Sequence, residues 1–318
     1  MTHPLLEPAV VQSVRQAAAA HRGRPWTPTG FTSLDHRGSH PCGIFTGTPF
    51  SVFAKLGRVP AAGPLFTAEL RGLELIRARA GGTGLTPVPV AGGTVAAGPG
   101  TLLLTEALPE RGGRAGQAAD GRTAGDYAAI GRTLARLHQA HGDAFGLAEF
   151  DGFFGPLPQS NQPLASGRWA DFFAERRLRP MLRLAAASGH LPAELAQGTE
   201  RVLASLPARC GPDPRPALLH GDAQQNNFVS GPGGAVVVDV APYYGHPEAD
   251  LAMTGIYHPA GPELLRAYAE RVPLDPGFAG RCELWRLPAY LAVIAVTGAT
   301  PFGRSFLPRL AAAVRRYQ

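Results

Sequence analysis

The stretch that decides the fold is residues 218–254, LLHGDAQQNNFVSGPGGAVVVDVAPYYGHPEADLAMT. Two leucines lead into a polar cluster, where Asp222 is followed by Asn227 five residues later and by Asp239 twelve residues after that. Residues 227–229 and 235–238 are typical of two strands, and the glycines and proline between them are typical of a turn. Such a hairpin brings Asn227 and Asp239 side by side.

The chemistry of these three side chains is that of phosphate transfer. Asn227 and Asp239 offer hard oxygen ligands, which suit Mg²⁺ because this ion prefers one or two carboxylates together with substrate phosphates. Asp222 lies just upstream on the loop and is free to accept a proton from a hydroxyl group. A catalytic Asp, an Asn and a later metal-binding Asp recur in this order in phosphotransferases of the protein-kinase type. The sequence therefore predicts ATP and Mg²⁺ as cofactors.

Length and composition indicate a globular protein of two lobes. A chain of 318 residues exceeds a typical single domain, and 45% of its residues are hydrophobic, enough for a substantial core. The net charge of +6 suits a polyanionic ligand such as ATP. The arginines are scattered among predicted helices, so we expect no nucleic-acid surface.

The cysteines and the apolar runs indicate the compartment. Cys42, Cys210 and Cys282 are widely spaced and form no CxxC pair, which favours a reducing compartment over a disulfide framework or a zinc site. The longest apolar run, at 291–296, is far shorter than the ~20 residues that span a bilayer. We expect a cytoplasmic protein without a membrane partner; the oligomeric state stays open, with a monomer favoured.

The first lobe carries the candidate nucleotide-binding residues. Lys55 is the only lysine among 30 basic residues, and it ends an apolar strand where a kinase lysine grips the α and β phosphates. Before this strand, Gly38 and Ser39 belong to a turn-rich piece that either covers phosphates with its backbone amides or is a plain hairpin turn. Cys42, beside this loop, is either a redox switch or an inert small residue.

The remaining elements of the first lobe complete this expectation. A helix is expected at 66–79, and its Glu69 is the candidate partner of Lys55. Glu74 of the same helix is the alternative partner. Strands at 88–90 and 100–104 complete a small sheet. We expect the backbone of a linker to pair with the adenine edge, and we place the lobe boundary at about residue 105. The linker residues are Thr105, Glu106, Ala107 and Leu108.

The second lobe is expected to be mostly helical. Thr123 and Asp126 form the pattern of a capping box, and helical spacing continues to His138, which is typical of a partner for the helix dipole. The aromatic side chains of Phe153 and Trp169 are expected to pack in the core. The alternative that they line a substrate site stays open. Further helices are predicted at 192–206, 262–271, 282–298 and 304–316.

The chain closely resembles the fructosamine kinase (ketosamine-3-kinase) family, within the aminoglycoside phosphotransferase and choline kinase group of kinase-like folds. The motifs that carry the resemblance are LLHGD with Asn227, VVVDVAPYYGHPEADLAMT, VFAKLGR, FTAELRGLELI, ARLH, LPQSN and FFAERRLRP, and they cover about residues 36–300. The resemblance implies an α+β fold of two lobes, with a small antiparallel sheet and one key helix in residues 1–105 and a mostly helical lobe in 106–318.

The resemblance also implies roles for particular residues. The family phosphorylates the sugar 3-hydroxyl of ketosamines, free or protein-bound, with ATP and Mg²⁺. Asp222 is then the base, Asn227 and Asp239 are the metal ligands, and Lys55 with Glu69 anchors the phosphates. His220 and Asp250 brace the catalytic loop, and the acceptor-side candidates are Gln224, Tyr244, His246 and Glu248.

One departure from the family pattern concerns the acceptor. Where the family has an aromatic residue two positions after the catalytic Asp, this chain has Gln224, which forms hydrogen bonds instead of stacking. Two alternatives therefore stay open: a kinase of the same fold for another hydroxyl, such as that of an aminoglycoside, nucleoside or peptide, and a nucleotide-binding regulator without turnover.

Overall fold

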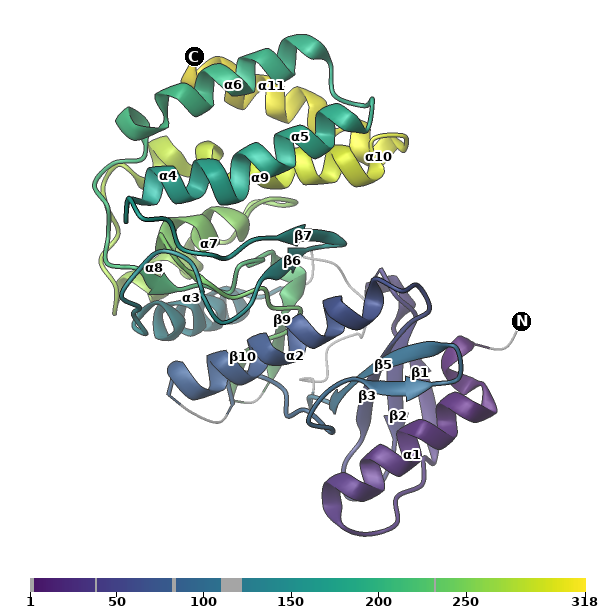
Figure 1. The fold of residues 1–318 in the computed structure, drawn as a ribbon. Helices are drawn as coiled ribbons and strands as arrows, with labels where there is room; N and C mark the ends of the chain where they lie inside the picture. The colour runs from purple at the N-terminus through teal and green to yellow at the C-terminus, as the bar shows by residue number, and fades with distance from the viewer. Residues whose placement is uncertain (1–2, 38, 82–83, 110–121, 232) are drawn as a thin grey trace.

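The computed structural model has two lobes (Figure 1). Residues of both lobes line one cavity. The structure describes residues 3–37, 39–81, 84–109, 122–231 and 233–318. In Figure 1 the small lobe holds the N-terminus and the sheet, and the C-terminus lies at the far end of the helical lobe. The predicted class, α+β with a small antiparallel sheet and a mostly helical second lobe, is confirmed.

The small lobe is built on a five-stranded antiparallel sheet. Its strands, in spatial order, are β1 (Gly30–Ser33), β2 (Cys42–Thr46), β3 (Val52–Gly57), β5 (Gly100–Glu106) and β4 (Val95–Ala97). The expected strand at 88–90 is only a bridge between Pro89 and Thr105. On either side of this bridge, the Val90 N–H donates to Leu104 O and the Glu106 N–H donates to Val88 O, so the segment contacts β5 through two backbone hydrogen bonds without forming a strand.

The sheet separates two helices. Helix α1 (Pro8–Arg22) covers one face, where Val14 packs with alternate strand residues such as Leu56 and Leu104. Helix α2 (Ala62–Arg79) covers the other face, where Leu103 points into a cluster around Phe66. Because side chains alternate between the faces of a strand, both faces are apolar and both helices are held in place.

Helix α2 also touches the second lobe. Gly72 faces Pro242 and Val240, and a Cβ at residue 72 would lie 2.7 Å from Pro242 Cδ. The missing side chain therefore lets the helix approach the chain just after Asp239. This contact fixes the residues of α2 relative to the hairpin of the second lobe.

The helical lobe contains one large core around Trp169, which packs on Phe172, Phe173 and Trp285. Trp169 thus belongs to the core and not to a substrate site. The helices of this lobe are α3 (Ala124–His138), α4 (Trp169–Phe173), α5 (Arg179–Ala187), α6 (Ala193–Arg209), α7 (Pro247–Met253), α8 (Pro262–Ala269), α9 (Phe278–Thr297), α10 (Pro301–Arg304) and α11 (Phe306–Tyr317).

Three short antiparallel pairs complete the second lobe. They are β6 (Gly152–Phe154) with β7 (Leu157–Gln159), β8 (Ala217–Leu218) with β11 (Tyr244–Gly245), and β9 (Phe228–Gly231) with β10 (Gly234–Val237). The capping box of Thr123 and Asp126 begins α3 as predicted. No helix in the described part of the chain is both long and apolar enough to cross a membrane.

Candidate active site

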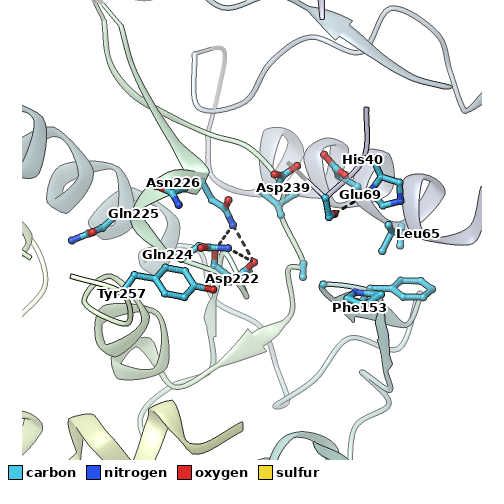
Figure 2. A pocket seen from close by; sticks show the side chains of 18 of the residues that line it. His40, Leu65, Glu69, Phe153, Asp222, Gln224, Gln225, Asn226, Asp239 and Tyr257 are labelled. Carbon is cyan, nitrogen blue, oxygen red and sulfur yellow. Dashed lines mark hydrogen bonds between the residues drawn. The ribbon is translucent and has the colours of Figure 1, made fainter. Parts of the chain in front are cut away.

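A cavity of about 900 Å³ lies between the lobes and collects most of the residues that the sequence singles out. The small lobe contributes Lys55 and Glu69, and the second lobe contributes Asp222, Asn227 and Asp239. Figure 2 shows Asp222 with Gln224 and Tyr257 on one side, and Asp239 with Glu69 and His40 on the other. The structure therefore brings these five residues, predicted from distant parts of the chain, to one cavity.

Lys55 lies between two carboxylates. Its Nζ is 2.9 Å from Glu69 Oε2 and 3.2 Å from Glu69 Oε1, and it also forms an ion pair with Asp239. Burial disfavours the Lys55 ammonium, but the two carboxylates outweigh burial and raise the pKa of Lys55. Glu69 is thus the partner of Lys55, as the sequence predicts, and Lys55 stays charged at neutral pH.

Asp239 adopts an unusual backbone conformation. Its φ of 52° is the one positive value for a non-glycine residue among those that the structure describes. Such a conformation is uncommon for an L-residue and is found mostly where the surroundings impose it. Burial opposes ionisation here, but Lys55 outweighs it and holds the pKa of the Asp239 carboxyl below its usual range. The carboxylate is therefore charged and faces the cavity.

The hairpin of β9 and β10 brings Asn227 to Asp239, as predicted. Asn227 immediately precedes β9, and its carbonyl accepts a hydrogen bond of 3.0 Å from the N–H of Val238. The side-chain nitrogen of Asn227 donates to Asp222 O at 2.9 Å and to Asp222 Oδ2 at 3.1 Å. Because the amide nitrogen makes both bonds, the amide oxygen is the end of this side chain that remains for a cation.

Asp222 has two oxygens in different surroundings. Oδ2 accepts from Asn227 and, at 3.2 Å, from Gln224 Nε2. Oδ1 is buried and has no hydrogen-bond partner in the described structure. Burial, with a further contribution from Asp239, raises the pKa of the Asp222 carboxyl to about 7. This carboxyl is therefore poised to take up a proton near neutral pH.

The turn that carries Asp222 is fixed by Asp250. The Asp250 carboxylate accepts from the backbone N–H of His220 at 2.6 Å and of Gly221 at 3.1 Å. His138 Nε2 lies 3.2 Å from the same carboxylate, so His138 braces this turn and is not a dipole partner on the surface. Gly221 has φ of 82°, and a Cβ there would lie 1.8 Å from Ala241 O. Only glycine fits this turn.

A second, narrower cavity of about 110 Å³ lies behind Lys55 and Asp239. Its walls are mostly apolar, and they include Glu106 and Leu108 of the linker. The N–H groups of Glu106 and Ala107 donate to Val88 O and Ser51 O, at 2.7 and 2.8 Å. Those two amides cannot also bind adenine, so the linker offers a ligand its carbonyl groups and the backbone of Leu108.

The candidate phosphate loop lies at the edge of the large cavity. Ser39 and His40 line the cavity, and Ser39 Oγ is 3.1 Å from His40 Nδ1. Gly38 falls outside the described residues. Cys42, at the start of β2, is buried and its Sγ donates to Leu34 O at 3.2 Å.

Three acceptor-side candidates lie elsewhere, and the structure corrects the expectation for them. Tyr244 pairs with Leu218 in the short β8–β11 ladder. The buried His246 caps helix α7 by accepting the Glu248 N–H at its Nδ1, at 3.2 Å. Glu248 is buried in an ion pair with Arg281. None of the three lines the large cavity as the structure describes it. In the described structure, His246 and Glu248 begin helix α7, and Tyr244 belongs to the short ladder just before it.

Gln224 is the one acceptor-side candidate that does face the cavity, and four neighbours were missed in the sequence. Tyr257 and Phe302, on segments after α7, line the same end of the cavity. Figure 2 places the ring of Tyr257 beside Gln224 and Asp222. Phe306 and Arg309 of α11 also line it. The helical periodicity of α11 predicts a helix but does not reveal which part of the fold it faces.

A buried arginine supports one wall of the cavity. Arg177 lies in a π-helical turn and donates to Ser160 O at 2.8 Å and to Asn161 Oδ1 at 2.6 Å. Its guanidinium carbon is 3.8 Å from the centre of the Tyr243 ring. These contacts hold the base of the β6–β7 hairpin, whose Phe153 lines the cavity.

The donors at the centre suit a hard cation. Two side chains, the Asp239 carboxylate and the Asn227 amide, lie together, and Mg²⁺ needs few protein ligands when substrate phosphates supply the rest. Within the described ranges, no group of three or more His, Cys, Asp or Glu side chains is arranged to hold a metal ion.

Comparison with solved structures defines the class. The chain has the protein-kinase-like fold of the aminoglycoside phosphotransferase APH(4)-Ia, with a TM-score of 0.61 and 14% identity over 96% of this chain and 98% of that one. It is more similar to a candidate fructosamine-3-kinase from Thermobifida fusca, with a TM-score of 0.79 and 29% identity over 96% of this chain and 99% of that one.

The chain belongs to the fructosamine kinase family, whose model matches residues 10–313. A "Probable ketoamine kinase" of Synechocystis is 31% identical over 89% of this chain and 90% of the relative. A "Probable ketoamine kinase" of Klebsiella aerogenes is 35% identical over 50% of this chain and 54% of the relative, so this match spans about half of that protein's length.

Proposed function

We propose that this protein is an ATP-dependent kinase that transfers the γ-phosphoryl group of ATP to the sugar 3-hydroxyl of a ketosamine. Residues 1–105 would form the nucleotide-binding lobe and residues 106–318 the catalytic and acceptor lobe. The observation that carries the proposal is the buried, unpartnered Asp222 Oδ1, in one cavity with the Lys55–Asp239 ion pair. Family membership and the names of the relatives support the ketosamine.

The two cavities suit the two parts of ATP. The smaller one has a mostly apolar lining that includes Leu108 of the linker, which suits the apolar faces of an adenine ring. Lys55 and Asp239 line both cavities, so phosphates that leave the narrow one pass these two charges. Glu69 orients the Lys55 ammonium, which binds the phosphates as a point charge.

Asp222 moves the proton. Its Oδ1 accepts the proton of the acceptor hydroxyl as that oxygen forms its bond to the γ-phosphorus and the bond to the β-phosphate oxygen breaks. Asn227 and Gln224 hold Oδ2 and so keep the carboxylate in one orientation. The proton ends on Asp222, and ADP leaves with the electron pair of the broken bond.

Asn227 and Asp239 would hold Mg²⁺, whose contribution when bound is to neutralise negative charge on the phosphate oxygens. Their oxygen donors, an amide and an ionised carboxylate, fit this ion. Replacement Asp239→Ala should abolish Mg²⁺-dependent ATP turnover while the melting temperature stays near that of the wild type. Wild-type turnover in this variant would overturn the metal assignment.

The acceptor is tested with a panel. Ribulosamines, fructosamines, aminoglycosides and a nucleoside are incubated with ATP and Mg²⁺, and ³¹P NMR locates the new phosphate ester. We expect a 3-phosphate on a ketosamine, and a ~10²- to 10⁴-fold lower kcat in Asp222→Asn, because that variant lacks the base. Transfer only to an aminoglycoside or nucleoside would refute the ketosamine. ATP binding without transfer to any acceptor would indicate a regulator.

A further inference from the structure

The charges that line the large cavity are divided between its two ends. Its three described carboxylates, Glu69, Asp222 and Asp239, all belong to the phosphoryl-transfer centre. At the other end, where α11 forms the wall, the ionisable side chains among the described lining residues are Arg309, His258 and Tyr257. An acceptor that extends from Asp222 toward α11 therefore meets positive charge.

Arg309 is held in place at this end. Its Nη1 donates to Ile256 O at 2.6 Å, and its guanidinium carbon lies 4.9 Å from the centre of the Phe306 ring. The bond to Ile256 uses one of the five N–H groups of a guanidinium. A planar, pre-oriented fork of N–H donors is suited to a carboxylate.

An aromatic corner lies beside this arginine. The ring centres of Tyr257 and Phe302 are 6.1 Å apart, and Phe306 lies 6.2 Å from Tyr257 and 5.3 Å from Phe302. Phe302 is 52% exposed, unlike most large apolar side chains of this lobe. The corner offers apolar surface for a short aliphatic chain between Asp222 and Arg309.

The amide-rich segment after Asp222 adds polarity without charge. Gln224 donates to Asp222 Oδ2, and Gln225 Nε2 donates to His258 O at 3.2 Å. Gln225 is buried in that contact, so it is the neutral amide of Gln224 that can bond a sugar hydroxyl without opposing a negative charge. A polycationic acceptor, in contrast, would find no carboxylate to pair with among the described residues of this end.

We propose that the acceptor carries a carboxylate and that Arg309 binds it, so that Arg309 selects the ketosamines of free amino acids over those of side chains within a protein. This inference rests on the proposed ketosamine kinase activity. The sugar lies at Asp222 and Gln224, the aliphatic part of the amino acid lies on the aromatic corner, and the carboxylate pairs with Arg309. A glycated lysine inside a protein has an amide in place of this carboxylate.

The test compares two compounds that differ only in this group: Nα-acetyl-Nε-fructosyl-lysine and its carboxamide. We expect kcat/KM to be ~10-fold higher for the acid, which corresponds to one charge-assisted hydrogen bond. In Arg309→Gln this preference should disappear because the acid loses activity while the amide keeps it. Arg309→Lys should retain part of the preference, since it keeps the charge but not the fork.

The matched control is Arg304→Gln, which removes another exposed arginine of the C-terminal region that does not line the cavity in the described structure. This variant should behave as the wild type. Equal use of acid and amide by the wild type would overturn the inference, as would an equal loss with both compounds in Arg309→Gln, since Arg309 would then only hold the Ile256 segment.

Calorimetric binding in the presence of a non-hydrolysable ATP analogue separates this inference from the proposed function. Binding of both compounds without any phosphate transfer would refute the ketosamine kinase activity, and the ratio of the two affinities would still decide the role of Arg309. Tighter binding of the acid, lost in Arg309→Gln, supports the inference. Failure of both compounds to bind would overturn it.

Discussion

His246 predicts a specific dependence of stability on pH. Its ring lies between two tryptophans, with ring centres 6.0 Å from Trp169 and 5.2 Å from Trp285, and its Nδ1 accepts the N–H of Glu248 at the start of α7. Burial lowers the pKa of His246 to about 4. A protonated Nδ1 could not accept that hydrogen bond, so the capping contact requires the neutral ring.

The sign and size of the effect follow from the two pKa values. Glu248 and Asp275 favour the imidazolium, whereas Arg281 and His138 oppose it, and burial outweighs all four. The unfolded chain, with a pKa near 6.5, takes up the proton as the pH falls, while the folded protein does not. At pH 5, which is about 1.5 units below the pKa in the unfolded chain, His246 lowers the free energy of unfolding by about 2 kcal/mol. The reference is a pH at which His246 is neutral in both states. The loss grows until the pH reaches about 4, where the folded protein also takes up the proton.

The assay is urea unfolding between pH 7 and pH 5 for the wild type and for His246→Asn. Asparagine is a good N-cap but does not titrate, so the variant should lack this part of the pH dependence. Other groups contribute to both curves: burial raises the pKa of Asp222 to about 7, which stabilises the fold as the pH falls. The difference between the two proteins isolates His246. A difference that stays constant with pH would refute the reasoning.

Three further predictions concern residues that act through their neighbours. Asp250→Ala should lower the free energy of unfolding in urea by about 3–5 kcal/mol, because it leaves the His138 ring and two backbone N–H groups without their acceptor; an unchanged midpoint would contradict this. Glu69→Gln should lower kcat by roughly 10²-fold in steady-state kinetics, since Lys55 then pairs with Asp239 alone. An unaltered kcat would show that Asp239 alone is enough to orient Lys55. Arg177→Leu should raise the KM for the acceptor by about 10-fold and speed hydrogen exchange at 150–161, because the base of the β6–β7 hairpin loses its hydrogen bonds to Arg177. Arg177→Lys should show smaller changes in both quantities. A change in kcat alone would show that Arg177 does not position this hairpin for the acceptor.

Much of the fold could be predicted because its elements are local and strongly patterned. The helix expected at 262–271 is found at Pro262–Ala269, and the capping box predicts the start of α3. The strand expected at 88–90 is reduced to one bridge with two backbone hydrogen bonds to β5, because apolar side chains favour pairing without determining how far along the chain it extends. Local pattern therefore predicts helices and hairpins better than it predicts the edges of a sheet.

The transfer centre could also be predicted, for a related reason. Asn227 and Asp239 flank one hairpin, and Asp222 lies on the turn just before it, so their spacing already implies their proximity. The acceptor end is different: Tyr257 and Arg309 come from separate segments that only the folded helices bring to the cavity. Neither residue forms a spaced motif with Asp222, and the most distinctive motif in the chain instead positions α7.

The acceptor end also explains how this chain tolerates Gln224 at a position where an aromatic residue is usual. An aromatic surface is still present, because Tyr257 lies beside Gln224 and continues into Phe302. Gln224 instead donates to Asp222 Oδ2, which leaves the buried Oδ1 as the oxygen that can take up a proton. Gln224 thus orients Asp222, and Tyr257 supplies an aromatic surface beside it. Restoring the aromatic with Gln224→Trp should therefore lower kcat more than it lowers affinity for the acceptor, and a gain in both would show that Tyr257 does not replace it.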